Sequence, residues 1–197
     1  MIRLREPGSA DPPRLDLDSL STLVGDASGR YYSILDYHRL YLSGKLTPLA
    51  VVESLLPLIR RDVPNPSRHS TAFILCDTES VIRAAEESTS RYKAGKPLSV
   101  FDGVVTAIKD ECKVAGYRTM YGRKQNDGFF KVEEESSWPV QKWQEAGGIV
   151  LGKLNMHEVG ADTTNNNPNW GTPRNPHNDQ YYTGGICSSF SWTRAFY

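Results

Sequence analysis

The feature that most constrains the fold is the order strand, helix, strand in residues 103–153. The run GVVTAIKD at 103–110 is β-branched and of strand length, and GIVLGK at 148–153 is a second apolar run. Between them, Ser137 is placed to cap a helix that Gly147 would end. Because both strands are continuously apolar, they are predicted to form a parallel pair in a covered sheet.

Apolar residues spaced three and four apart predict three more helices upstream. Capping residues and glycine stops bound them. They are a helix at 31–42 stopped by Gly44, a helix capped by Thr47 that bends or ends near Pro57, and a helix capped by Asp77 or Thr78 that ends before Gly95. The run TAFILC at 71–76 predicts a short strand. The chain therefore has an α/β pattern.

Composition limits the partners of the chain. Its 197 residues suit one domain or a piece of a larger one. Residues 1–29 are rich in Pro, Gly, Ser and Asp, which predicts an irregular N-terminal arm. Lys plus Arg and Asp plus Glu are equal at 23 each, which argues against binding to nucleic acid or a membrane surface. The segment lacks a signal peptide and any 18-residue apolar run, so a cytoplasmic location is expected.

Cysteine and histidine patterns argue against metal sites. The three cysteines (Cys76, Cys112 and Cys187) are widely spaced and lack a partnering histidine pattern, which disfavours a disulfide framework and a zinc site. His157 has no second histidine four residues on, so a turn or core role is predicted for it. No metal or organic cofactor is expected. Core or interface positions are predicted for Trp138, Trp143 and Trp170.

Two groups of residues carry chemistry. Lys109 directly follows an apolar strand, and it is either a surface charge or a desolvated functional amine. The Asn-, Gly- and Pro-rich stretch at 165–176, with YYTGGICSS at 181–189, predicts a long surface loop with tight turns or, alternatively, a cradle of backbone amides. No P-loop lysine follows Gly184 and Gly185, which disfavours nucleotide binding.

The segments GVVTAIKDECKVAGYRT, SSWPVQKWQEAGGIVLGKLNMHEVGADTTNNNPNWGTPRNP and YYTGG occur in this order. In this they resemble the first half of the amidase-signature family, especially its fungal members. The resemblance covers residues 30–185, leaving 186–197 as a tail outside the family pattern. It implies the N-terminal portion of the amidase-signature fold, a mixed sheet covered by helices, in truncated form.

The resemblance also implies a chemistry, which is hydrolysis of a small-molecule carboxamide through an acyl-enzyme by a Ser-cisSer-Lys triad. Motif matching puts the triad's base at Lys109 and the oxyanion loop at Gly184 and Gly185. A lysine with an ordinary pKa of about 10.4 must be desolvated to accept a proton at neutral pH, and the end of a buried strand provides such a setting.

The sequence departs from the family pattern after Gly185. A gapless alignment puts Ile186 at the bridging serine, and Ser188 could take its place only if the loop slipped by two residues. The family's nucleophilic serine lies further downstream, and no matching segment follows here. We therefore expect an inactive, unstable fragment of an amidase, with a shifted reading frame, a retained intron or a truncated gene model as the origin of the tail. The alternative is a non-catalytic α/β binding or interaction fragment.

Overall fold

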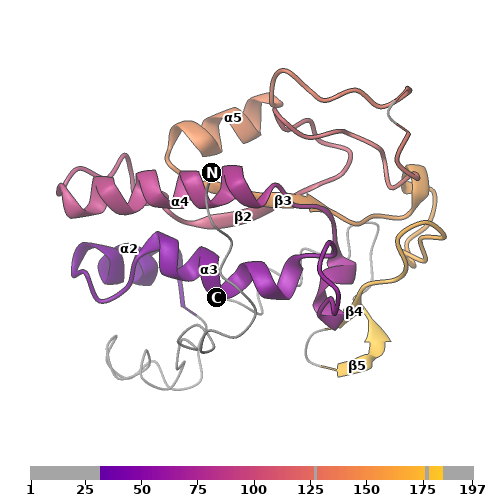
Figure 1. The fold of residues 1–197 in the computed structure, drawn as a ribbon, viewed down its shortest axis with the longest axis horizontal. Coiled ribbons are helices and arrows are strands. Elements are labelled where there is room, and N and C mark those ends of the chain that lie inside the picture. Colours follow the sequence, from indigo (N-terminus) through magenta and orange to yellow (C-terminus); the bar gives the residue numbers. More distant parts are fainter. Residues whose placement is uncertain (1–31, 127, 176–177, 184–197) are drawn as a thin grey trace.

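A three-stranded mixed sheet lies at the centre of the fold (Figure 1). The computed structural model describes residues 32–126, 128–175 and 178–183, so the predicted arm and tail lie outside it. The strands are β1 (Phe73–Leu75), β2 (Val105–Lys109) and β3 (Ile149–Leu154), in the order β1-β3-β2. β2 and β3 are parallel, which confirms the prediction from the two apolar runs, and β1 runs antiparallel to β3.

The four helices of the described chain begin and end close to the predicted signals. They are α2 (Ile34–Leu42), α3 (Pro48–Ile59), α4 (Thr78–Lys93) and α5 (Trp138–Glu145), with short 3-10 turns η1 (Arg68–Ala72) and η2 (Glu158–Gly160). The Thr47 hydroxyl accepts from the Ala50 amide and the Asp77 carboxylate accepts from the Ser80 amide, so both predicted caps form. Ser137 precedes α5 without a side-chain cap bond.

The helices cover both faces of the sheet. Alternate residues of a strand face opposite sides, and β3 shows this directly. Ile149 and Leu151 belong to the large core under α2, α3 and α4, whereas Val150 belongs to a smaller cluster with Val140 of α5. Figure 1 shows α5 on the far side of β2 and β3 from α2 and α3. Gly152 lets β1 approach β3 closely, because a Cβ at position 152 would lie 2.2 Å from the Leu75 carbonyl oxygen.

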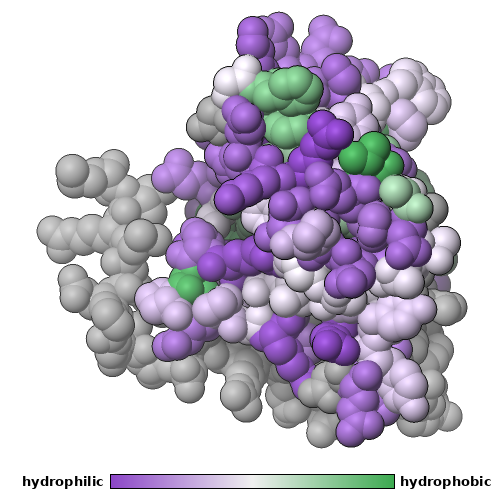
Figure 2. All heavy atoms as spheres, turned by 90° about the vertical axis from the view of Figure 1, so that its right-hand side faces the viewer, coloured by the Kyte–Doolittle hydropathy of each residue, from purple (hydrophilic) through white to green (hydrophobic). Residues whose placement is uncertain are grey.

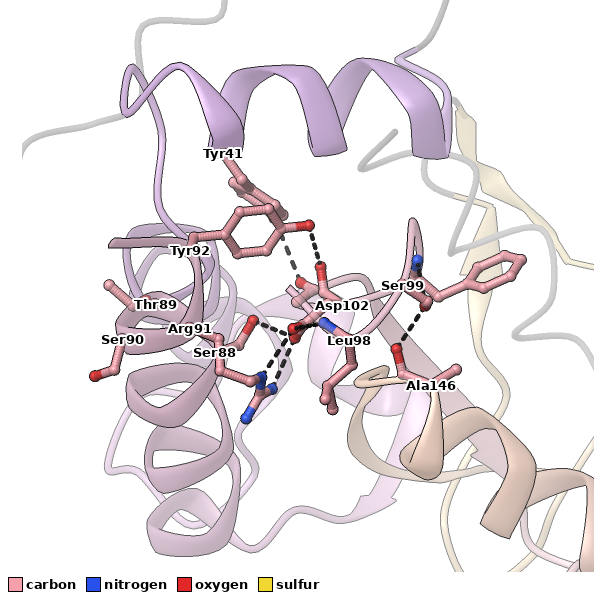
Figure 3. A network of polar contacts seen from close by, with 12 residues as sticks. Tyr41, Ser88, Thr89, Ser90, Arg91, Tyr92, Leu98, Ser99, Asp102 and Ala146 are labelled. Atoms are coloured by element: carbon pink, nitrogen blue, oxygen red, sulfur yellow. Dashed lines mark hydrogen bonds and ion pairs between the residues drawn. The ribbon is translucent and has the colours of Figure 1, made fainter. Parts of the chain in front are cut away.

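A buried carboxylate ties α4 to the loop that leads into β2 (Figure 3). Asp102 has no exposed surface, and it accepts two hydrogen bonds from the Arg91 guanidinium, at 2.7 and 2.8 Å. The Ser88 hydroxyl at 2.6 Å and the Leu98 amide at 2.9 Å also donate to it. Tyr92 adds a bond from its hydroxyl to the Asp102 carbonyl oxygen. The start of β2 is thereby fixed against α4.

α3 ends at Ile59, two residues past Pro57, in agreement with the predicted end near that proline. Two other expectations need correction. Part of the predicted surface loop is a two-stranded ribbon, β4 (Arg174–Asn175) and β5 (Asn178–Tyr182), since backbone pairing outweighs the turn propensity of asparagine there. Trp138 is not a core residue, because its position at the start of α5 leaves it 69% exposed; its other predicted role, at an interface, stays a prediction.

Trp143 and Trp170 do pack as predicted. Trp143 contacts the cluster between α5 and the sheet, and Trp170 contacts the cluster around Ile74 and Met120. β1 and β2 are the two edges of the sheet within the described residues. None of the helices in the described ranges has both the length and the apolar character needed to cross a membrane.

Candidate functional site

Lys109 is the last residue of β2, and a tight turn begins at it. The Cys112 amide donates to the Lys109 carbonyl oxygen at 3.0 Å, which closes the turn. The Lys109 amine lies 2.8 Å from a Glu111 carboxylate oxygen, and the Lys109 side chain is 20% exposed. The amine is therefore at the boundary of the protein, neither fully in solvent nor fully desolvated by the described residues.

The residue after Lys109 belongs to a buried ion pair. Asp110 and Lys153 of β3 have no exposed side-chain surface, and the amine of Lys153 lies 3.4 Å from the Asp110 carboxylate. The carboxylate also accepts from the amides of Met120, at 3.3 Å, and Gly122, at 2.8 Å. The Lys153 amine donates to the Cys112 carbonyl oxygen at 2.6 Å. β2, β3 and the 119–122 loop thus meet at one charged centre.

Burial dominates the electrostatics of this pair. It lowers the pKa of Lys153 and raises the pKa of Asp110, because desolvation disfavours the charged form of each group. The opposite charge of the partner acts against both shifts, and so do the amides of Met120 and Gly122 for Asp110. The two pKa values therefore move toward each other, and the ionic state of the pair depends on the hydrogen bonds around it.

The strand register separates the two lysines. Ile108 is opposite Lys153 and Lys109 is opposite Leu154 in the parallel ladder. Since neighbouring residues of a strand face opposite sides of a sheet, Lys109 lies on the face of the large core and Lys153 on the face covered by α5. The buried pair therefore supports the Lys109 turn from the opposite face and makes no contact with the Lys109 amine.

Asparagine side chains shape the loops beyond β3. Asn167 donates to the carbonyl oxygens of Met156 and Gly122, at 2.6 and 2.8 Å, and its own oxygen accepts from the amide of Trp170. Asn155 donates to the carbonyl of Gly171 at 2.9 Å. These bonds dock the 165–171 loop against the 120–123 loop and against the residues that directly follow β3. The Asn-rich stretch, predicted as a surface loop with tight turns or as a cradle of backbone amides, is thus partly buried.

Strained backbone marks the same place. Val159 adopts φ +58, a conformation that a β-branched residue rarely takes, and Tyr121 has φ +56. The Val159 amide donates to the Tyr121 carbonyl oxygen at 2.8 Å, so the two strained residues support each other. His157 directly precedes the η2 turn that contains Val159, in agreement with its predicted turn role.

The surface near this end of the sheet is mainly polar. Figure 2 shows the face that carries the loops and the β4–β5 ribbon, where hydrophobic residues form small, separate patches among hydrophilic ones. A cavity of about 320 Å³ lies elsewhere, between α4 and α5, and Asp77, Arg91 and Gln144 are among its lining residues. Lys109 does not line that cavity.

The structure places only part of the predicted site. Lys109 is described, whereas Gly184, Gly185 and Ser188 lie outside the described residues, so their distances to Lys109 stay predictions. Asp110 and Lys153 were not predicted from the sequence. Lys153 ends the apolar run GIVLGK much as Lys109 ends GVVTAIK, so the sequence pattern did not separate the buried lysine from the partly exposed one. Within the described ranges, no three His, Cys, Asp or Glu residues are grouped to hold a metal ion.

Known proteins are similar to this chain over the segments that surround Lys109. The family model described as Amidase matches residues 65–189, more than half of the chain. The match extends past the predicted boundary at 185, which stays a prediction. A fatty acid amide hydrolase of Arabidopsis thaliana is 40% identical over 166 residues, covering 82% of this chain and 26% of that protein.

Two further relatives widen the comparison. A mitochondrial glutamyl-tRNA(Gln) amidotransferase protein of Ixodes scapularis is 34% identical over 128 residues, covering 61% of this chain and 25% of that protein. A crystal structure of an amidase superposes with a TM-score of 0.71 and 26% identity, covering 84% of this chain and 36% of the other. The chain spans about a quarter of the length of the curated relatives it matches.

Proposed function

Because this chain belongs to the amidase family, we propose that it supplies the lysine-bearing part of a site that hydrolyses a small-molecule carboxamide. In this proposal Lys109 is the base, and the Gly184–Gly185 loop contributes the amides that bind the oxyanion. The observation that carries the proposal is the position of Lys109 at the carboxyl end of β2. Open α/β sheets place their reacting groups at this edge.

The chemistry follows from the needs of amide cleavage. A serine hydroxyl attacks the carbonyl carbon, and its proton passes through a second hydroxyl to the neutral amine of Lys109. The carbonyl oxygen becomes an oxyanion that backbone amides stabilise. Return of the proton to the leaving nitrogen releases ammonia or an amine, and water then cleaves the acyl-enzyme by the same route. Lys109 must therefore separate from Glu111 and lose its proton before it acts.

We place the nucleophilic serine downstream of Gly185, as the family pattern implies. Residues 1–185 therefore supply the base without the nucleophile, and this portion alone is expected to release no product from amides. A complementing segment should restore turnover. The comparisons do not fix the amide, because a fatty acid amide hydrolase and an amidotransferase protein match overlapping parts of the chain.

The experiment joins residues 1–185 to the part of the Arabidopsis relative that follows the corresponding loop. Release of ammonia from a fatty acid primary amide and an aryl primary amide is measured for the chimera and for the 197-residue chain. Lys109→Ala in the chimera is expected to lower kcat/KM by about 10²- to 10⁴-fold, the range that a positioned base contributes.

Lys113→Ala is the matched control. Lys113 is four residues away, 61% exposed, and ion-paired with Glu133 at 3.0 Å, so its loss should leave kcat/KM unchanged. Circular dichroism establishes that each variant is folded. A folded chimera that cleaves neither amide, or one that keeps its activity with Lys109→Ala, contradicts the proposal.

A non-catalytic interaction role is the second candidate. The ion pair of Lys109 with Glu111 favours it, since a partly exposed, paired ammonium is the ordinary state of a surface lysine. An inert chimera together with a stable monomeric 197-residue chain would support this role.

A further inference from the structure

The turn that begins at Lys109 is held by β3 as well as by its own hydrogen bond. The Cys112 amide bonds to the Lys109 carbonyl, and the Cys112 carbonyl accepts from the Lys153 amine at 2.6 Å. The same amine pairs with Asp110, the second residue of the turn. Lys153 therefore contacts two of the four residues in the turn, although it lies on the neighbouring strand.

A second loop completes the arrangement. The Asp110 carboxylate accepts from the Gly122 amide at 2.8 Å and from the Met120 amide, and the Lys153 amine lies 3.4 Å from the Thr119 hydroxyl. The 119–122 loop is therefore connected to the Lys109 turn through the buried pair. Free rotation of the turn about the end of β2 would break several bonds at once.

Stability alone is a weak reason for such a pair. Both side chains are fully buried, and a buried ion pair is often no more stabilising than apolar residues of the same volume. What an apolar pair cannot do is bond the Cys112 carbonyl and the Gly122 amide in fixed directions. The distinctive effect of the charges is therefore on geometry.

We infer that Asp110 and Lys153 form a clamp that fixes the backbone of the Lys109 turn from the far face of the sheet and thereby positions the Lys109 amine. They are positioning residues and do not contact the amine. The consequence for amide hydrolysis rests on the proposed function of Lys109, whereas the clamp itself is tested without any activity.

The test uses the 197-residue chain with the paired change Asp110→Asn and Lys153→Met. This pair leaves net charge unaltered, so the ionic environment of Lys109 changes little. Amide hydrogen exchange at Cys112 is expected to rise about tenfold relative to amides of α4, because a charge-assisted bond to the turn is lost. The rate at which acetic anhydride acylates Lys109, measured by mass spectrometry relative to Lys113, is expected to rise as well.

The control removes another ion pair that is remote from the turn, with Arg91→Met and Asp102→Asn. It destabilises the protein in general but is expected to leave the Lys109 to Lys113 acylation ratio and the Cys112 exchange unchanged relative to wild type. If the clamp variant behaves like this control, the inference is overturned. In the wild-type chain the Cys112 amide must exchange as slowly as the amides of β3, and fast exchange there overturns it even if the clamp variant does not fold.

The two proposals fail separately. A clamp variant with increased Lys109 acylation, combined with a chimera whose activity ignores Lys109→Ala, supports the clamp and contradicts the function. A clamp variant with unchanged Lys109 acylation, combined with a chimera whose activity depends on Lys109, contradicts the clamp and supports the function.

Discussion

Replacing Asp102 by asparagine tests how much burial adds to an ion pair. The Asp102 carboxylate is fully buried and accepts four hydrogen bonds, two of them from Arg91 (Figure 3). Asparagine keeps one acceptor oxygen and directs an amide group at donors. Breaking one side of a buried pair costs about 3–5 kcal/mol. Since the Arg91 side chain is 27% exposed and regains water, we expect a loss near the lower limit, about 3 kcal/mol.

Asp62→Asn is the matched control. Asp62 accepts two bonds from Arg60, at 2.7 and 2.9 Å, with nearly the same geometry, but the Asp62 side chain is 65% exposed. An exposed pair contributes about 0–1 kcal/mol. Urea unfolding followed by circular dichroism at pH 7 measures both variants. With an m value of about 1–3 kcal/mol per M, the Asp102 variant should lose roughly 1–3 M in midpoint and the Asp62 variant far less.

The pH dependence supplies a second test. Burial alone would raise the pKa of Asp102, but hydrogen bonds from Arg91, Ser88 and the Leu98 amide outweigh it and hold the pKa below its ordinary value. Because the pKa of Asp102 is lower in the folded protein than in the unfolded chain, where it is about 3.9, the ionised carboxylate stabilises the fold. This contribution is complete above the pKa of the unfolded chain and is lost as the pH falls through the pKa of the folded protein. The stability difference between wild type and Asp102→Asn should therefore be full at pH 7 and shrink below about pH 4. Equal losses for Asp102→Asn and Asp62→Asn, or a difference independent of pH, would refute this reasoning.

Two further comparisons test the backbone in the same unfolding assay. Gly103→Ala should be strongly destabilising, because Gly103 has φ +76 and a Cβ there would lie 2.5 Å from a Pro48 side-chain carbon. Gly95→Ala should cost only about 1 kcal/mol, because Gly95 has a similar φ of +68 but open space around it. Similar losses at the two glycines would show that the contact with Pro48 is relieved by movement. Thr47→Ala should cost about 1 kcal/mol through its lost cap, whereas Ser137→Ala should cost less, because the Ser137 side chain makes no cap bond. The prediction fails if Ser137→Ala is the more harmful change.

The local elements were predictable from the sequence. Asp77 and Gly95 bound α4, and Thr47 with Pro48 starts α3, because caps and stops act within a few residues of the chain. The parallel pair of β2 and β3 was predictable for a related reason, since a helix between two apolar strands leaves few other arrangements. The family segments around Lys109 were likewise present in linear order.

The sequence did not show which lysine is buried. Lys109 and Lys153 each end an apolar run of similar appearance, and only the latter is fully enclosed. Asp102, in a loop next to the exposed Phe101, gave no sign of being a buried carboxylate either. The burial of a charge depends on partners far away in the chain. Lys153, for example, pairs with Asp110, which lies 43 positions earlier in the sequence. Periodicity and capping in a sequence report local free energies, whereas desolvation and its compensating bonds exist only once the strands and loops have packed together.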